Sequence, residues 1–127
     1  MNAEPVHQPT DEDDLPRRFL TEADLPRVQT GPGVRPPAVL GRHFTAVVLH
    51  PRPETQVPDH AHPEEVLGIV VEGYLDLVIG GVPGRVEAPG YYHVPPGVVH
   101  SAHGGLGHVI EVFAPARGDL VGTEPDD

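Results

Sequence analysis

Between residues 38 and 114 the chain is a series of short apolar or alternating runs separated by glycine and proline. No part of it keeps helical periodicity for about ten residues, and short runs bounded by turn residues are typical of β-strands. Gly80-Gly81, directly after one such run, is a hairpin signal. The sequence therefore predicts an all-β sandwich or barrel. The expected strand segments are 38–50, 55–62, 66–72, 74–79, 82–88, 91–95, 98–103 and 108–114.

The 127 residues fit one domain that is large enough to bury a core. Residues 1–16 are rich in acid and proline, which predicts a disordered tail. Residues 17–37 form an irregular arm that contains a short capped turn, residues 38–114 form the barrel, and residues 115–127 form an acidic C-terminal tail. The 17 prolines and 15 glycines punctuate the apolar runs at regular spacing, which favours turns over general disorder.

The charge distribution argues against two classes of partner. The formal net charge is −11, and all eight basic residues are arginines that form no cluster. Nucleic acid and anionic membranes are therefore not expected as partners. No apolar run reaches about eighteen residues and no leader pattern is present, so a cytoplasmic location is the default expectation.

Several kinds of chemistry are absent from the sequence. There is no lysine for a Schiff base and no cysteine for a disulfide or thiolate ligand. Ser101 is the only serine and lies outside a G-x-S-x-G elbow, and no dinucleotide or P-loop motif occurs. Nine histidines remain, so a histidine-bound metal is the strongest catalytic candidate.

The histidines at 60 and 62 have a spacing that suits metal binding. Side chains two apart on a strand point to the same face, so His60 and His62 can aim two imidazoles at one point. A third imidazole from a distant strand, His100, would complete a site for a divalent metal, because neutral imidazole suits iron, nickel, copper and zinc.

Two longer patterns contain these histidines. Residues 60–73 read HAHPEEVLGIVVEG and residues 90–100 read GYYHVPPGVVH. In order and spacing they resemble the two motifs of the cupin superfamily, and the resemblance covers about two thirds of the chain. It implies a cupin-type β-barrel, that is, a jelly roll or double-stranded β-helix, with a divalent metal (iron, manganese, nickel or zinc) held by His60, His62 and His100.

The sequence departs from the cupin pattern at the fourth ligand. Val66 occupies the slot that usually holds a carboxylate or amide, and Glu65 lies one residue early. Pro63 could break the strand and let Glu65 turn inward as a metal ligand. Alternatively, Glu64 and Glu65 form a solvated loop end. A third interpretation is that the fold persists without metal binding.

Further residues are candidates by position. His93, near the pocket position of small cupins, is a candidate fourth ligand or acid/base, and His103 is a candidate for a pocket role; for both, a structural role is the alternative. Glu72 and Glu111 could orient a histidine N–H. Arg42, Arg52 and Arg85 are candidates for an anion clamp or for ordinary surface arginines.

The resemblance implies a metalloenzyme that acts on a small oxygenated molecule. Iron would support dioxygenation, whereas zinc or nickel would support isomerisation or cyclisation through a polarised carbonyl or enolate. The alternative is a non-catalytic module that binds or senses a small ligand or metal. A homodimer is also expected, through an outer sheet or through a strand added by residues 19–28.

Overall fold

The computed structural model describes residues 18–31 and 33–120, and this part of the protein is built almost entirely of β-strands. One turn of 3-10 helix, η1 (Glu22–Asp24), precedes the strands. The strands are β1 (Ala38–Leu40), β2 (Thr45–Leu49), β3 (Gln56–His60), β4 (Glu65–Ile79), β5 (Val82–Glu87), β6 (Gly90–Val94) and β7 (His100–Ala114). The predicted all-β fold is confirmed. The predicted N-terminal tail and residues 121–127 of the predicted C-terminal tail lie outside the described residues.

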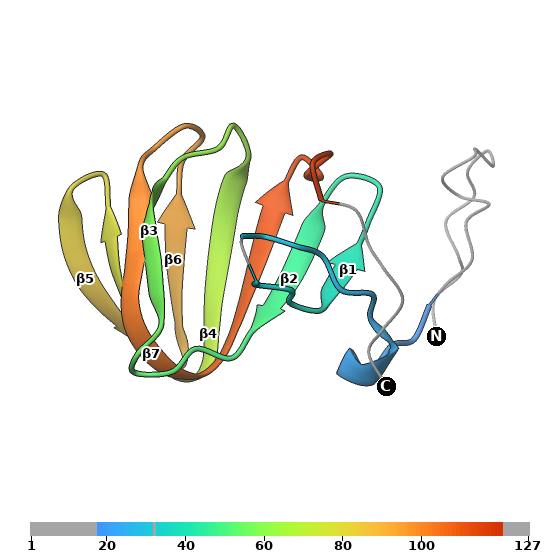
Figure 1. Ribbon diagram of the computed structural model, residues 1–127, viewed down its shortest axis with the longest axis horizontal. Coiled ribbons are helices and arrows are strands. Elements are labelled where there is room, and N and C mark those ends of the chain that lie inside the picture. Colours follow the sequence, from blue (N-terminus) through green and yellow to red (C-terminus); the bar gives the residue numbers. More distant parts are fainter. Residues whose placement is uncertain (1–17, 32, 121–127) are drawn as a thin grey trace, which may run out of the picture.

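The two longest strands, β4 and β7, pair antiparallel along most of their length. The strand order is β1-β2-β7-β4-β5, with β3 also beside β7 and β6 also beside β4 (Figure 1). Every pairing between these strands is antiparallel, as in a jelly roll. The hairpin predicted at Gly80-Gly81 is present, because Ile79 pairs with Val82 across it.

Glycines bend β4 and β7 without ending them. The sequence predicted separate strands on either side of Gly73 and on either side of residues 104–107, and this prediction is wrong. Gly73 and Gly107 are paired across the two strands with φ angles of 79° and 104°. Such angles are open to glycine but strained for other residues, so a bend is possible here without loss of pairing.

The core lies between the inward faces of the bent sheet. Its most buried residues are valines from β2, β4, β6 and β7: Val47, Val66, Val70, Val94 and Val109. It also includes Leu25 and Val28 from the arm, and Leu120 beyond β7, so core packing extends past both ends of the segment predicted as barrel.

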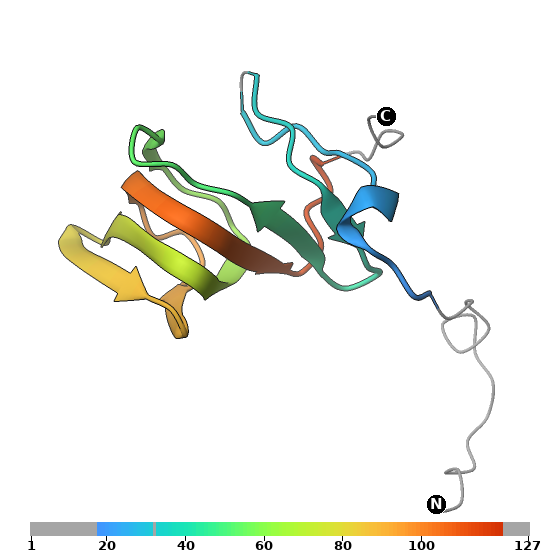
Figure 2. The same cartoon turned by 90° about the horizontal axis from the view of Figure 1, so that it is seen from below.

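The N-terminal arm lies beside β1 and β2 (Figure 2). The Ala38 amide donates to the Pro26 carbonyl at 2.9 Å, and the Val28 amide donates to the Pro36 carbonyl at 3.0 Å. Together with the burial of Val28, these bonds fix the arm against the chain's own sheet. Within the described residues, no helix is long and apolar enough to cross a membrane.

Candidate metal centre

His60, His62 and His100 come together at one end of the sheet. His60 ends β3 and is the register partner of His100, the first residue of β7. His62 lies in the turn after β3, so the predicted reason for its position, a strand face shared with His60, is wrong. One ring nitrogen from each histidine lies within 4.8 Å of the other two. The ring centroids are 4.1 Å apart for His60–His100 and 4.9 Å apart for His62–His100.

Backbone carbonyls orient all three rings in the same way. The Nδ1 atoms of His60 and His100 lie 2.9 Å from the carbonyl oxygens of Pro58 and Val98. His62 Nδ1 lies 3.0 Å from the carbonyl oxygen of Glu64. A carbonyl only accepts, so each Nδ1 carries the proton and each Nε2 keeps its lone pair. Three Nε2 lone pairs are therefore free to bind one cation.

Burial favours the neutral form of the His100 ring. Burial lowers the pKa of His100 below its ordinary value, and the nearby His60 and His62 lower it further. His100 is 7% exposed and His62 is 9% exposed, whereas His60 is open to solvent. The cluster thus has three ring nitrogens close together and one accessible side. The donor set fits a divalent transition metal.

A carboxyl group faces the histidines from inside the barrel. Glu111 pairs in register with Gly68, and the Tyr92 hydroxyl donates to its Oε2 at 2.5 Å. A Cβ at position 68 would lie 2.0 Å from the Tyr92 ring, so glycine is required there for this contact. Burial raises the pKa of Glu111, whereas Tyr92, His60 and His62 act in the opposite direction. Burial and the adjacent carboxyl hold the pKa of Tyr92 well above its usual range.

The raised pKa of Glu111 predicts how the folding stability of the protein depends on pH. A carboxyl whose pKa is higher in the folded state favours folding below its unfolded pKa, and this contribution is lost as the pH rises through the folded value. In metal-stripped protein, the melting temperature of Glu111→Gln should therefore be higher than that of wild type at pH 8. At pH 4 the two melting temperatures should be nearly equal. Each unit of the pKa difference corresponds to about 1.4 kcal/mol. Calorimetry at both pH values measures this, and a Glu111→Gln protein less stable than wild type at pH 8 would contradict it.

Arg117 is a charged group that lies near His62, on the other side of the Phe113 ring. The Arg117 guanidinium lies 4.9 Å from the centre of the Phe113 ring, which in turn packs edge-on against His62. Arg117 donates to Asp119, with Nη2 at 2.6 Å from the carboxylate, and its Nε lies 3.9 Å from Glu64 Oε1. This Glu64 oxygen is buried without a hydrogen bond. Arg117 is thus held in place by two carboxylates.

An apolar cavity of about 230 Å3 lies between β4, β5 and β6. Its lining includes the ring of Tyr92, whose hydroxyl reaches Glu111, and the buried Leu77. Ile79, which pairs in register with His100, lines it as well. The rest of its lining comes from β5, whose residues 82–85 are exposed, and neither Glu111 nor the three clustered histidines line it.

Several solved structures have a similar arrangement of strands. A protein described as an RmlC-like cupin, from Shewanella frigidimarina, has a TM-score of 0.69 and 27% identity, over 82% of this chain and 96% of that one. KdgF from Halomonas sp. has a TM-score of 0.69 and 21% identity, over 82% of this chain and 98% of that one. The chain has a cupin fold. A mutant of the oxalate decarboxylase OxdC from Bacillus subtilis matches with a TM-score of 0.64 and 17% identity, over 84% of this chain but 32% of that one.

No protein-family model and no curated protein sequence matches the chain. The cupin fold therefore stands on the structural matches together with the positions of the motif residues. The motif slot at Val66 does face the barrel interior, where its side chain is 1% exposed and apolar.

The predicted fourth ligands lie on the outside of the cupin barrel. Glu65 and His93 are both about half exposed and pair with each other, with Oε2 and Nε2 2.5 Å apart. Neither belongs to the three-histidine group. The structure therefore does not bring Glu65 or His93 to the candidate centre, and Pro63 does not turn Glu65 inward. The alternative, a solvated loop end, fits neither residue fully: Glu65 is solvated but begins β4, and the side chain of Glu64 is only 12% exposed.

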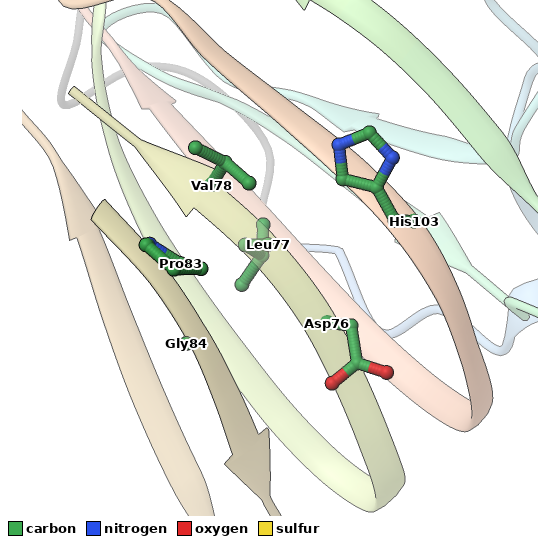
Figure 3. Close-up of a pocket in the computed structure, with 6 residues that line it drawn as sticks. All are labelled: Asp76, Leu77, Val78, Pro83, Gly84 and His103. Atoms are coloured by element: carbon green, nitrogen blue, oxygen red, sulfur yellow. The ribbon is translucent and has the colours of Figure 1, made fainter. Parts of the chain in front are cut away.

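His103 lies at a different place, in a hollow of about 370 Å3 on the outside of the barrel (Figure 3). The other lining residues are Asp76, Leu77, Val78, Pro83 and Gly84, with none of the three clustered histidines among them. His103 Nε2 lies 2.7 Å from the Ser101 hydroxyl, and Nδ1 lies 3.2 Å from Gln56 Oε1. Its ring nitrogens are thus engaged away from the candidate centre.

Three polar residues of the interior were not assigned to the site from sequence. Arg117 was not among the arginines considered, and Arg85 is instead paired with Asp76 on the surface at 2.8 Å. Alternation along a strand predicts one of the rings of Tyr91 and Tyr92 inside and the other outside, and their exposures of 67% and 6% confirm this. Glu111 was considered only as an orienting group. Parity with Val109 and Phe113 could have placed it inside, because side chains two apart on a strand share a face.

Proposed function

We propose that the protein is a metal-dependent enzyme that acts on a small oxygenated organic molecule, by dioxygenation or by isomerisation or cyclisation. One observation carries the proposal: three imidazoles whose Nδ1 atoms are engaged by backbone carbonyls lie near a carboxyl group of raised pKa inside the barrel. A donor set that holds a metal and a group that exchanges a proton are the two parts such chemistry needs.

Each part of the site has a role that follows from its position. His60, His62 and His100 would hold the ion, which when bound supplies Lewis-acid chemistry at a carbonyl or enolate oxygen, or oxygen chemistry if it is iron. Glu111 holds or accepts a proton at its carboxyl. Tyr92 orients that carboxyl through its hydroxyl group.

The apolar surroundings also contribute. The hollow beside Tyr92 is open to solvent on the side of β5 and leaves room for a small organic molecule. Arg117 is already neutralised by Asp119 and Glu64, so we assign it to positioning Phe113 under His62 and not to binding an anionic substrate.

The test separates metal binding from proton transfer. Untagged protein is loaded with one metal at a time and incubated with a panel of keto acids, diketones and hydroxy acids. An oxygen electrode reports dioxygenation, and NMR of solvent deuterium incorporation reports enolisation. Glu111→Gln is expected to keep its metal and to lose about 100-fold or more of the rate found. Equal rates in Glu111→Gln and wild type would contradict the assigned role.

A non-catalytic binding module is the second candidate, because the cavity beside Tyr92 is lined mainly by apolar side chains. It predicts ligand binding without turnover, and binding that does not change when the metal is removed. Isothermal titration of metal-loaded and metal-free protein with the same panel distinguishes the two functions.

We also propose that the protein forms a homodimer through the outer face of β4, β6 and β7. Leu67 is 46% exposed and pairs in register with Val112, and Tyr91 is 67% exposed and pairs with Ile69. These side chains, with Ile110, make a continuous apolar surface, and such surfaces on soluble proteins mark interaction sites.

The dimer proposal predicts a change in mass. Wild type should have twice the chain mass of 13.6 kDa by light scattering, and Leu67→Arg should have the mass of one chain. Val82→Arg, at an exposed apolar position on β5, is the matched control and should stay dimeric. A monomeric wild type at micromolar concentration would contradict the proposal.

A further inference from the structure

A second group of metal-binding side chains lies outside the barrel, away from the three-histidine cluster. It consists of Glu22 in η1, His50 just after β2 and His108 in β7. One donor atom from each residue lies within 4.8 Å of the other two. His50 Nε2 is 3.0 Å from Glu22 Oε2, and the rings of His50 and His108 are 4.9 Å apart. Residues far apart in the sequence therefore converge on one point.

The hydrogen bonds of this group leave a place for a positive charge. His50 Nδ1 lies 3.3 Å from the Gly107 carbonyl oxygen, so in the neutral ring Nδ1 carries the proton and the Nε2 lone pair faces the Glu22 carboxylate. Two acceptors that face each other repel unless a proton or a metal cation lies between them.

His108 supplies an independent observation. Its Nε2 is buried and has no hydrogen-bond partner, which is costly for a polar atom. A proton shared between His50 and Glu22 does nothing for this nitrogen. A cation bound by all three residues would satisfy the Nε2 of His108 and the facing pair at once.

We propose that Glu22, His50 and His108 form a second divalent-metal site, of the zinc type, that fastens the N-terminal arm to the outside of the barrel. Two imidazoles and one carboxylate, with water in the fourth position, are a common zinc donor set. The side chains of His50 and Glu22 are 52% and 44% exposed, and the two hollows beside β5 are lined by other residues. The site is therefore structural, and it links η1 to β2 and β7.

The chain contains a matched control for this proposal. Glu65 and His93 form another exposed pair of a carboxylate and an imidazole, with 2.5 Å between Oε2 and Nε2, but that pair belongs to no group of three donors. If exposed Glu–His pairs simply collect zinc, Glu22→Gln and Glu65→Gln will behave alike. If the third donor matters, only Glu22→Gln will lose binding.

Equilibrium dialysis of the untagged full chain against low-micromolar zinc, followed by elemental analysis, tests the site. Wild type and Glu65→Gln should each hold two zinc ions per chain. Glu22→Gln should hold one tightly and bind the second at least tenfold more weakly, with unchanged circular dichroism. The loss of one tight ion from wild type to Glu22→Gln is the decisive result, whatever metal the barrel site holds. Equal numbers of tight zinc ions in wild type and Glu22→Gln would overturn the proposal.

A second measurement reports the position of the metal. Arg27 lies in the arm just after η1, so trypsin cleavage there reports release of the arm. Zinc should slow this cleavage at least threefold in wild type and in Glu65→Gln, and should not slow it in Glu22→Gln. Equal protection by zinc in all three proteins would place the protective ion elsewhere and overturn the proposed link to the arm.

Discussion

Replacing His100 with alanine is expected to lower the metal bound inside the barrel at least tenfold. His100 contributes one of three Nε2 donors and is the least exposed of the three histidines. Without it the remaining two nitrogens hold a divalent ion much less tightly, because each lost ligand removes a bond that the solvent only partly replaces. Elemental analysis after dialysis measures the effect. His100→Ala is introduced into a protein that also carries Glu22→Gln and is compared with Glu22→Gln alone. The elemental analysis then counts only the metal bound in the barrel site.

His93→Ala is the control for this experiment. His93 is also a strand histidine, but its ring is on the outside and paired with Glu65, so its removal should leave the metal content unchanged. Unchanged metal in the His100→Ala protein would remove His100 from the site. Protons compete for the same lone pairs, so the metal should dissociate as the pH falls below about 6. Full occupancy at about pH 4 would contradict a site made only of histidines.

Gly73→Ala is expected to destabilise the protein by roughly 3 kcal/mol or more. An alanine at a φ of 79° costs about 1–2 kcal/mol by itself. In addition, its Cβ would lie 1.8 Å from the Leu106 carbonyl oxygen, a backbone atom of the paired strand. Relief requires β4 and β7 to separate at their bend, and forced repacking of this kind adds about 1–3 kcal/mol. Thermal denaturation should show a drop of more than about 10 °C, at roughly 4 °C per kcal/mol.

Gly81→Ala separates the two causes. Gly81 has a φ of 82°, nearly that of Gly73, but nothing lies within 4 Å of the position of its Cβ. Gly81→Ala should therefore lower the free energy of unfolding only by the cost of the strained backbone, about 1–2 kcal/mol. Equal losses in the two variants would mean that the close approach of Leu106 does not contribute.

Most of the fold follows from local pattern. Alternation predicts that Tyr91 and Tyr92 lie on opposite faces, and Gly80-Gly81 predicts the hairpin, because side-chain parity and turn chemistry act over a few neighbouring residues. The glycines at 73 and 107 have, in local sequence, the pattern of strand ends. Whether a glycine ends a strand or bends it depends on the partner strand, and local sequence does not contain that information.

The sequence by itself determined that the chain is all-β and that His60, His62 and His100 are the residues to bring together. Parity along the last strand is consistent with an inward Glu111, but only the tertiary structure brought Glu111 to the same side as the histidines and left Glu65 facing solvent. The tertiary structure also brought Glu22 to His50 and His108. The physical reason is strand register. A shift of one residue turns every side chain to the other face, and the irregularities near Gly73 fix that register only when β4 and β7 pair.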